Sequence, residues 1–497
     1  MMFPTLVLMV LLCLAARSLA CDTGASPFKS TGIACRVTKP AALVLNQKTT
    51  QVIQAAFKHA KYPSMKGERS VLFIGKVLYG LNNLEIHNLS IGKSEVELRE
   101  NDAIGIEIHN VSATFKGTLQ YGYGSWLLNL GHSVDFEIES QIDLRVNTKL
   151  YCRKGRVAAD TTDCTLIFHR LLLHLQGDKE PGWIKKLFTD FISFTVKLVI
   201  KSQICKEINT VANIMADFIQ ERAELFLSDG DIGMDISLTA SPSMRASYIE
   251  SHHKGLVLHR KVPSSFLNES VFSPALLSES RMLYFWISDQ VLNPMVKAAH
   301  EDLRFIRHIA GDELKELFQV DLSGTMPDIL HQIISSENPL AKVWSLAAPE
   351  LSMVPQGTTV KSTAAVELRT NSSDTESPAL YIETDVEVVV QASYANKKLF
   401  LDANPISISI RKVSDSAGMD LDADSDMDYF KQMVHRIGIP KVISYLELGL
   451  TSLMDSNNLN LFEIINPEII TQKGYVVVQL DFGFPHHLLV DFLKKNF

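Results

Sequence analysis

The chain has 497 residues, with 48 basic and 56 acidic side chains and a formal net charge of −8. This balance gives no reason to expect nucleic acid or another polyanion as a partner. Hydrophobic residues make up 46% of the chain and charged residues only 21%, a generous apolar share for a chain long enough for two or three domains. The excess must be buried, either in cores or around an apolar ligand.

Residues 1–20 have the features of a secretory signal peptide. Residues 5–16 form a short apolar run without an acidic residue, and Ser18 and Ala20 place small side chains at the cleavage positions before Cys21. A retained membrane anchor is the alternative, but the run is shorter than the about 20 residues that a span needs. We therefore expect a secreted, extracellular protein without a transmembrane segment. Export would allow glycosylation at the sequons of Asn88, Asn110, Asn268 and Asn371.

Removal of Cys13 with this segment leaves five of the six cysteines: Cys21, Cys35, Cys152, Cys164 and Cys205. Because this number is odd, at least one thiol stays free or pairs between chains. The cysteines form no CxxC pair and are not interleaved with histidines, so the sequence predicts neither a zinc site nor another cofactor.

The next elements predicted along the chain are a helix and long strands. Residues 41–60 have apolar side chains at helical spacing, whereas residues 104–108 and 134–150 alternate apolar and polar side chains, the pattern of half-buried strands. At ~3.3 Å per residue, the longer of these strands would reach about 55 Å, well beyond an ordinary strand. Residues 381–390 show a similar pattern, so we expect long, twisted antiparallel sheets.

A much longer helix is predicted over residues 183–227. Its apolar arc is wide, which fits either a helix buried in a core or a helix that faces a sheet on one side and a second apolar partner on the other. Periodicity alone does not separate these two interpretations.

The order of the elements suggests two similar halves. The helix over 183–227 leads into predicted strands over 232–238 and 245–249, and a predicted helix over 429–454 leads likewise into strands over 464–470 and 475–482. We therefore expect domains over residues 21–260 and 281–484, a Ser-rich linker over 261–280 and an amphipathic C-terminal helix over 485–497. Residues 310–362 give no clear pattern.

Several short motifs resemble those of the family of bactericidal/permeability-increasing, lipopolysaccharide-binding and phospholipid transfer proteins. The matching stretches span nearly all of the chain and are similar to the lipid transfer members. They include residues 42–46 (ALVLN), 203–209 (QICKEIN), 227–233 (LSDGDIG), 465–470 (INPEII) and 481–485 (DFGFP).

The resemblance implies an α+β fold shaped as an elongated boomerang. Two similar twisted β-barrel halves, each with a long helix, would be joined by a central antiparallel sheet, with a lengthwise hydrophobic tunnel. It also implies a secreted plasma protein that exchanges cholesteryl esters, triglycerides and phospholipids between lipoprotein particles without covalent catalysis. Its partners would be the surfaces of HDL, LDL and VLDL particles, and its role would lie in cholesterol transport and HDL remodelling.

The resemblance also implies roles for residues at matching positions. Gln220 and Arg222, at the end of the long helix, would bind a phospholipid headgroup, and Ser251 and His253 would add neutral hydrogen bonds. Cys164 and Cys205, on a predicted strand and a predicted helix, would form a disulfide. Side chains that would line the tunnel are Phe285, Phe462 and Ile464, and those that would form its lid are Leu488, Leu489, Phe492 and Leu493.

Alternative interpretations exist for three of these features. Arg222 could be a solvated cation that complements the helix dipole. His252 and His253 could bind a metal, but no third ligand is near in the sequence. Alternating aspartates over residues 420–428 are similar to calcium loops, but they lack the glycine and the closing glutamate of an EF-hand. We predict an acidic loop before a helix there, and no metal site.

Two other functional classes are disfavoured. A lipase would need a G-x-S-x-G nucleophile motif, which the chain lacks, as it lacks H-E-x-x-H and a phosphate-binding glycine loop. An endotoxin-binding protein of the same fold would favour a basic tip for phosphorylated lipid, and the acidic total disfavours this.

Overall fold

The computed structural model describes residues 21, 28–46, 54, 62–71, 75–100, 103–123, 131–176, 182–263, 267–273, 280–370, 379–415, 424–456 and 463–483. The predicted signal segment and C-terminal helix, with Leu488, Leu489, Phe492 and Leu493, lie outside these residues, as do Asn371 and Phe462. Residues 39–46 are helical, at the start of the predicted helix over 41–60.

The N-terminal half is built on one long antiparallel sheet with the strand order β2-β3-β5-β6-β7, in which β4 also pairs with β5. The strands are β2 (Met65–Val71), β3 (Gly75–Ser90), β4 (Lys93–Leu98), β5 (Ile104–Tyr123), β6 (Gly131–Arg153) and β7 (Arg156–Leu175). The strand predicted over 134–150 is confirmed as part of β6, which has 23 residues.

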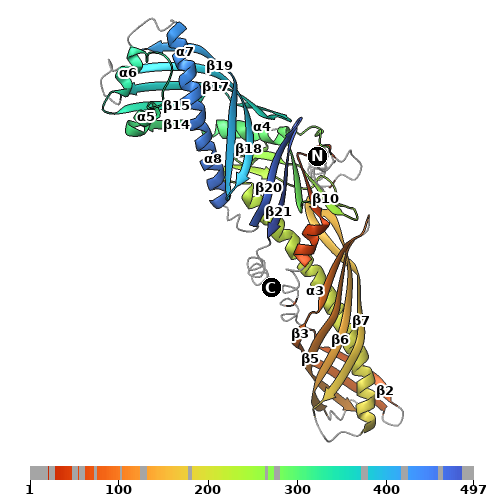
Figure 1. Cartoon of the computed structure of the whole chain (residues 1–497). Helices are drawn as coiled ribbons and strands as arrows, with labels where there is room; N and C mark the ends of the chain where they lie inside the picture. Colours follow the sequence, from red (N-terminus) through yellow and green to blue (C-terminus); the bar gives the residue numbers. More distant parts are fainter. Residues whose placement is uncertain are drawn as a thin grey trace, which may run out of the picture.

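Alternation along β6 places one set of side chains in the core. Phe136, Ile138, Ile142 and Leu144 are buried, and Ser140, which interrupts the apolar series, is buried too and donates a hydrogen bond to the Ala113 carbonyl. The helix α3 (Gly182–Phe226) packs against β7 and runs the length of the sheet (Figure 1). The twisted barrel expected for this half takes the form of a strongly twisted sheet covered by this helix.

The C-terminal half repeats this plan with a second sheet, in the order β14-β15-β17-β18-β19, with β16 paired to β17. Its strands are β14 (Ile306–Ala310), β15 (Pro339–Ser345), β16 (Glu350–Val354), β17 (Gly357–Thr370), β18 (Ala379–Ala395) and β19 (Lys398–Asp415). The short helices α5 (Gly311–Leu317) and α6 (Asp328–Ile334) pack against its strands. These elements fill the region over 310–362 that gave no clear pattern.

The helix predicted over 429–454 has different boundaries in the structure. It begins at Asp424 as α7 (Asp424–Met433), passes through a π-helical turn, η1 (Val434–Gly438), and continues as α8 (Ile439–Ser456). Asp424 and Asp426 lie in the first turn, where acidic side chains stabilise the helix dipole. Part of the predicted acidic loop is therefore helix.

A central sheet joins the halves, in the order β20-β21-β13-β1-β10-β9. Its strands are β1 (Ile33–Thr38), β9 (Ser243–Met244), β10 (Tyr248–His253), β13 (Leu283–Ser288), β20 (Glu463–Gln472) and β21 (Tyr475–Gly483). A small sheet of β8 (Ile232–Asp235), β11 (Leu256–His259) and β12 (Val262–Pro263), and the helix α4 (Asp289–Glu301), lie beside it. The strand predicted over 245–249 is wrong in its bounds, because the chain turns between β9 and β10 at residues 245–247.

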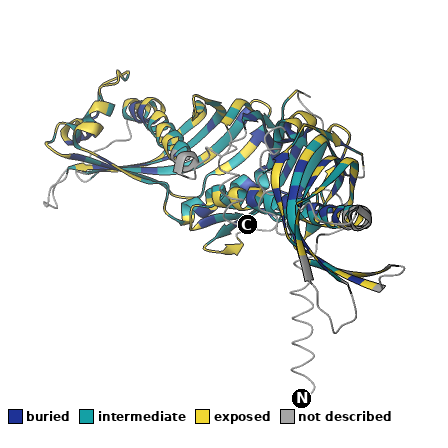
Figure 2. Ribbon diagram, turned by 90° about the horizontal axis from the view of Figure 1, so that it is seen from below, coloured by how far each residue is buried: buried dark blue, intermediate teal, exposed yellow. Residues whose placement is uncertain are grey.

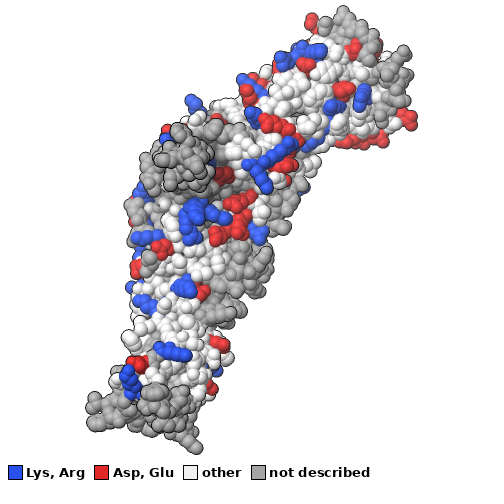
Figure 3. Space-filling view, turned by 180° about the vertical axis from the view of Figure 1, so that it is seen from behind, with Lys and Arg blue, Asp and Glu red and all other residues white. Residues whose placement is uncertain are grey.

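The molecule is an elongated boomerang with the central sheet at its bend (Figure 1). Each arm consists of a twisted sheet and a long helix, which confirms the predicted two-part architecture. Basic and acidic side chains are interspersed over the described part of the face in Figure 3. Among the described helices, none is both long and apolar enough to cross a membrane.

Candidate functional site

The two faces of the central sheet differ in how tightly they are packed. Along β1, Ala34, Arg36 and Thr38 are buried, while Ile33 and Cys35, which point to the opposite face, are partly exposed. Burial alternates in the same way along β13. Figure 2 shows such alternation of buried and intermediate residues along the strands of the molecule. We refer to these as the packed face and the open face.

A buried ion pair holds the packed face together. Arg36 Nε donates to Glu250 Oε2 over 2.8 Å, and His252 Nε2 lies 2.9 Å from Glu250 Oε1. The Arg36 guanidinium also lies 4.0 Å from the ring centre of Tyr248 and 5.1 Å from that of Trp286. Burial raises the pKa of Glu250, but the hydrogen bonds from His252 and Arg36 outweigh it and hold that pKa below its ordinary value. The carboxylate is therefore charged and paired, as a buried charge requires.

A row of five side chains crosses the middle of the open face. Strand pairing aligns Ile469 with Val478, Val478 with Phe285, and Cys35 with both Phe285 and Ser251. All five are partly exposed. We call Ile469, Val478, Phe285, Cys35 and Ser251 the central row.

Helices cover the open face on both sides of the central row. On one side, Phe218 of α3 packs with Leu283 and Phe482. On the other, Val291 of α4 packs with Ile33 and Ile287.

Within the described residues, the central row belongs to none of the hydrophobic core clusters. It thus leaves apolar side chains partly exposed between two helices, the environment in which an apolar ligand gains most from burial.

At the Ser251 end of the central row, the polar groups are neutral and hydrogen-bonded to one another. His253 Nδ1 lies 2.8 Å from the Ile236 carbonyl, so this nitrogen carries a proton, and burial lowers the pKa of His253, which favours the neutral ring. His253 Nε2 is then an acceptor for the Ser251 hydroxyl at 2.9 Å. Burial raises the pKa of Cys35 to about 12, so its thiol, which is hydrogen-bonded to Ser251, stays protonated. The chain of neutral groups suits uncharged polar atoms of a ligand.

The other predicted ligand residues lie at two further places. Ile464 is aligned with Phe482 and so shares the open face. Gln220 and Arg222 lie in the last turns of α3, where Gln220 Nε2 donates to Glu224 Oε1 over 3.0 Å. Arg222 is exposed, has no carboxylate within 4.0 Å among the described residues, and its guanidinium lies 5.5 Å from the Phe218 ring centre. The structure thus groups Ser251, His253 and Phe285, and it places Arg222 beside Phe218, which packs on Leu283 and Phe482 of the same sheet.

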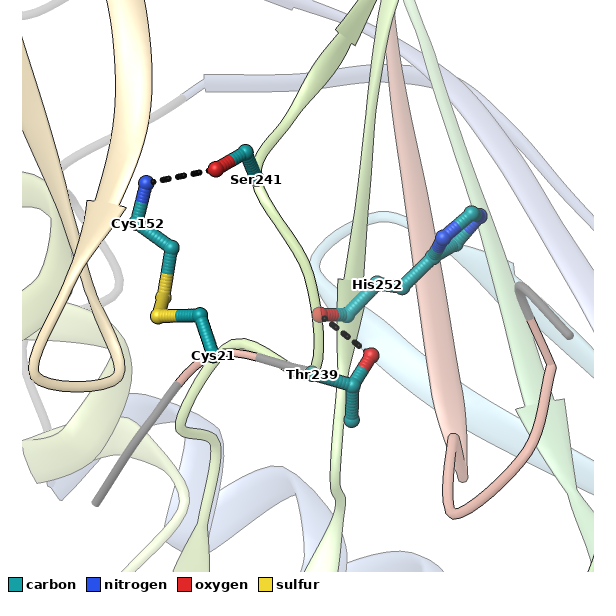
Figure 4. The surroundings of a disulfide bond; sticks show 5 residues. All are labelled: Cys21, Cys152, Thr239, Ser241 and His252. Carbon is teal, nitrogen blue, oxygen red and sulfur yellow. Dashed lines mark hydrogen bonds between the residues drawn. A yellow bond between two sulfur atoms is a disulfide. The ribbon is translucent and has the colours of Figure 1, made fainter. Parts of the chain in front are cut away.

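Two disulfides brace the N-terminal half. Cys164 on β7 is joined to Cys205 on α3, the pairing that the resemblance implies. Cys21 is joined to Cys152 near the end of β6, a link that the sequence left open, and Cys35 is free. The Cys152 amide donates to Ser241 Oγ over 3.1 Å, beside the hydrogen bond from Thr239 to the His252 carbonyl (Figure 4). This disulfide therefore attaches Cys21 close to the central sheet.

Apolar cavities lie in both halves of the molecule. In the N-terminal half, a small cavity of about 20 Å³ is lined by apolar side chains that include Phe115, Ile142 and Ile204. In the C-terminal half, a cavity of about 140 Å³ is lined mainly by apolar side chains, with Arg307 and Tyr445 among them. Sequence reasoning missed these residues and also Cys35, Val478 and Ile469. The strands predicted over 464–470 and 475–482 contain Ile469 and Val478, but the sequence did not assign either residue a role.

Comparisons with known proteins agree across the chain. The model of the LBP / BPI / CETP family, N-terminal domain, matches residues 43–217, and that of the C-terminal domain matches residues 227–457. The cholesteryl ester transfer protein of Gallus gallus is 52% identical over 98% of this chain and 97% of its own length. The cholesteryl ester transfer protein of Homo sapiens is 48% identical over 97% and 98%.

More distant matches carry other names. The lipopolysaccharide-binding protein of Homo sapiens is 24% identical over 60% of each chain. A crystal structure of lipopolysaccharide binding protein superposes with a TM-score of 0.50 at 16% identity, covering 91% of this chain and 99% of that one, which shows the shared fold alone. From the two family models and the full-length relatives together, we conclude that the chain belongs to the LBP / BPI / CETP family.

Proposed function

We propose that this chain is a secreted plasma lipid carrier that exchanges cholesteryl esters and triglycerides, and also phospholipids, between lipoprotein particles. The observation that carries the proposal is the central row, a mainly apolar strip left partly exposed on the central sheet at the bend of the molecule. The names of the full-length relatives support the same ligand class. The proposal requires no covalent step, because the lipid is transferred intact from one particle to another.

A carrier of this kind solves a physical problem. Each buried CH₂ group is worth about 0.8 kcal/mol, so a bare sterol ester leaves a particle through water very slowly. The cavities in the two halves and the central row offer apolar surface in each part of the molecule. We propose that they form one lengthwise tunnel when lipid fills it.

Each predicted ligand residue then has a role. Phe285 and Ile464 contact acyl chains from the open face, and Phe462 precedes the same strand. Ser251 and His253 hydrogen-bond neutral ester or glycerol oxygens. Arg222, with Gln220 beside it, contacts a phospholipid phosphate. Leu488, Leu489, Phe492 and Leu493 form the lid.

The proposed organisation also includes parts outside the ligand site. The segment 1–20 directs export, and residues 261–280 separate the two lipid-binding domains. The side chains of Asn88, Asn110 and Asn268 are exposed, so export makes them available for glycosylation.

Lipopolysaccharide is the alternative ligand within this family. The lipopolysaccharide-binding relatives are 21% to 25% identical, against 47% to 52% for the cholesteryl ester transfer proteins. The net charge of −8 also disfavours a multiply phosphorylated lipid. Competition of lipopolysaccharide against labelled cholesteryl ester for the purified chain separates the two.

Filling the central row tests the proposal. Val478→Trp places a bulky ring in the row, whereas Val271→Trp, at a site that is 65% exposed, is a matched control. We expect Val478→Trp to reduce transfer of labelled cholesteryl ester between donor and acceptor particles at least fivefold, and Val271→Trp to leave it unchanged. Normal transfer by folded, secreted Val478→Trp protein would contradict the proposal, as would release of labelled fatty acid in place of intact ester.

A further inference from the structure

The cavity of about 140 Å³ in the C-terminal half differs from the central row in its chemistry. It lies between β14, β15, β17 and the helices α5, η1 and α8, and most of its wall is apolar, with side chains such as Leu317, Phe318 and Val434. The π-helical turn η1 forms part of the wall, and such turns occur frequently at functional sites.

Three cationic side chains line this otherwise apolar cavity, and they differ in their partners. Arg304 is paired with Asp229 and Asp302. Lys441 Nζ lies 2.8 Å from Glu313 Oε1.

Arg307 is different. It is exposed, and among the described residues no carboxylate lies within 4.0 Å of its guanidinium. It donates to the Ile306 carbonyl over 2.8 Å and lies 5.7 Å from the ring centre of Tyr445.

Tyr445 brings a further polar group to the same place. Its hydroxyl donates to Glu313 Oε1 over 3.1 Å, and its ring centre lies 4.9 Å from Lys441 Nζ. The cations Arg307 and Lys441 thus lie near the same aromatic ring. The carboxylate of Glu313 pairs with Lys441. One positive charge remains in excess at this edge of the cavity.

We infer that this cavity binds a long-chain carboxylate, that is, a single-chain fatty acid, with its chain among the apolar side chains and its head at Arg307. An arginine fork matches a carboxylate in geometry and charge. A neutral ester would fill the apolar space equally well but would gain nothing from Arg307. The inference goes beyond the proposed transfer function, because it concerns a charged lipid class that is held at Arg307, and its binding is measured without any transfer step.

Paired probes that differ only in charge test the inference. cis-Parinaric acid and its methyl ester, both fluorescent, are titrated into the purified full chain. We expect the acid to bind about tenfold more tightly than the ester, and Arg307→Gln to weaken the acid about tenfold while leaving the ester unchanged. Lys431→Gln on α7, which removes a cation that does not line the cavity, is the matched control and should alter neither affinity.

A second pair of variants tests the place of binding. Gly438 lines the cavity, and a Cβ there would meet only the Met433 carbonyl oxygen, at 3.9 Å. Gly438→Phe should therefore fill space in the cavity and weaken acid and ester alike. Gly449→Phe on the same helix, where a Cβ meets nothing within 4 Å, should weaken neither.

Three outcomes would overturn the inference. Equal affinity of acid and ester in the parent chain would make the cavity a neutral-lipid space. Equal weakening of both probes by Arg307→Gln would indicate a structural effect in place of charge recognition. Unchanged acid binding in Gly438→Phe, with its fold verified by circular dichroism, would place the acid elsewhere.

Discussion

The two arms of the boomerang share a plan but are stabilised differently. The N-terminal arm has an unbroken helix of 45 residues, the longest strands, two disulfides and a cavity of about 20 Å³. The C-terminal arm has no cysteine, its helix contains a π-helical turn, and its cavity reaches about 140 Å³ with cationic side chains among its lining. Open space in a core lowers stability. The arm with covalent cross-links has the smaller cavity, whereas the arm without them has the larger and more polar one.

This difference suggests a division of labour. In the N-terminal arm, the wholly apolar lining of the cavity suits contact with neutral lipid. In the C-terminal arm, Arg307 and Tyr445 make the cavity selective for a charged head. If the arms and the joint between them, which is the central sheet, behave as separate units, changes in each should have separate effects.

Loss of a disulfide should have the largest effect. Cys164→Ala unlinks β7 from α3 and should cost about 2–5 kcal/mol, enough to reduce secretion severely. Cys35→Ala, which breaks no disulfide, is the control. Secretion is measured by immunoblot of medium and cells, and stability by thermal unfolding. Equal secretion of Cys164→Ala and the parent chain would show that the N-terminal arm does not depend on this cross-link.

The joint between the arms should respond to acid. The pKa of Glu250 is lowered in the folded protein from an ordinary value of 4.5, so its carboxylate stabilises the fold above that value. This contribution is lost as the pH falls below 4.5 and through the lowered pKa. Glu250→Gln should cost about 1.5–3 kcal/mol at pH 7.

Thermal unfolding from pH 7 to pH 3 measures this effect. The difference in melting temperature between the parent chain and Glu250→Gln should shrink once the pH passes below 4.5. A difference that stays constant over the whole range would assign the stability of the joint to packing of Trp286 and Tyr284 alone.

The smallest effect is expected at the exposed end of α3. Arg222→Ser should reduce the phospholipid retained by the purified protein a few-fold, because an exposed charged contact contributes about 1 kcal/mol. Lys431→Ser on the C-terminal arm is the matched control and should retain the parent amount. Phosphorus analysis of extracted lipid gives the measurement. Unchanged phospholipid in Arg222→Ser would favour the solvated helix-end cation.

Local patterns predicted the long elements well, because each is encoded by neighbours in the sequence. Alternation over 134–150 gave β6, and helical spacing over 183–227 gave α3 within a residue at each end. The aspartates at 424 and 426 were misread, because alternation in sequence resembles a loop while the helix dipole favours the same residues in a first turn.

The site itself depends on pairings that local patterns do not contain. Cys35 meets Ser251 and Phe285 through strand pairs across more than 200 positions of the chain, and no spacing rule connects them. The Cys21–Cys152 link is equally remote. The resemblance supplied Ser251, His253 and Phe285, whereas the cationic lining of the C-terminal cavity became visible only when α5, β14 and α8 were placed together.

The central claim is that the apolar strip inside the bend holds neutral lipid. Mass spectrometry of lipid extracted from the purified, secreted protein tests this most directly, with Val478→Trp protein extracted in parallel. The account predicts cholesteryl esters and triglycerides together with phospholipid from the parent chain, and a marked loss of the neutral lipids from Val478→Trp. A parent chain that carries no neutral lipid, or one whose neutral lipid is unchanged by Val478→Trp, would contradict it.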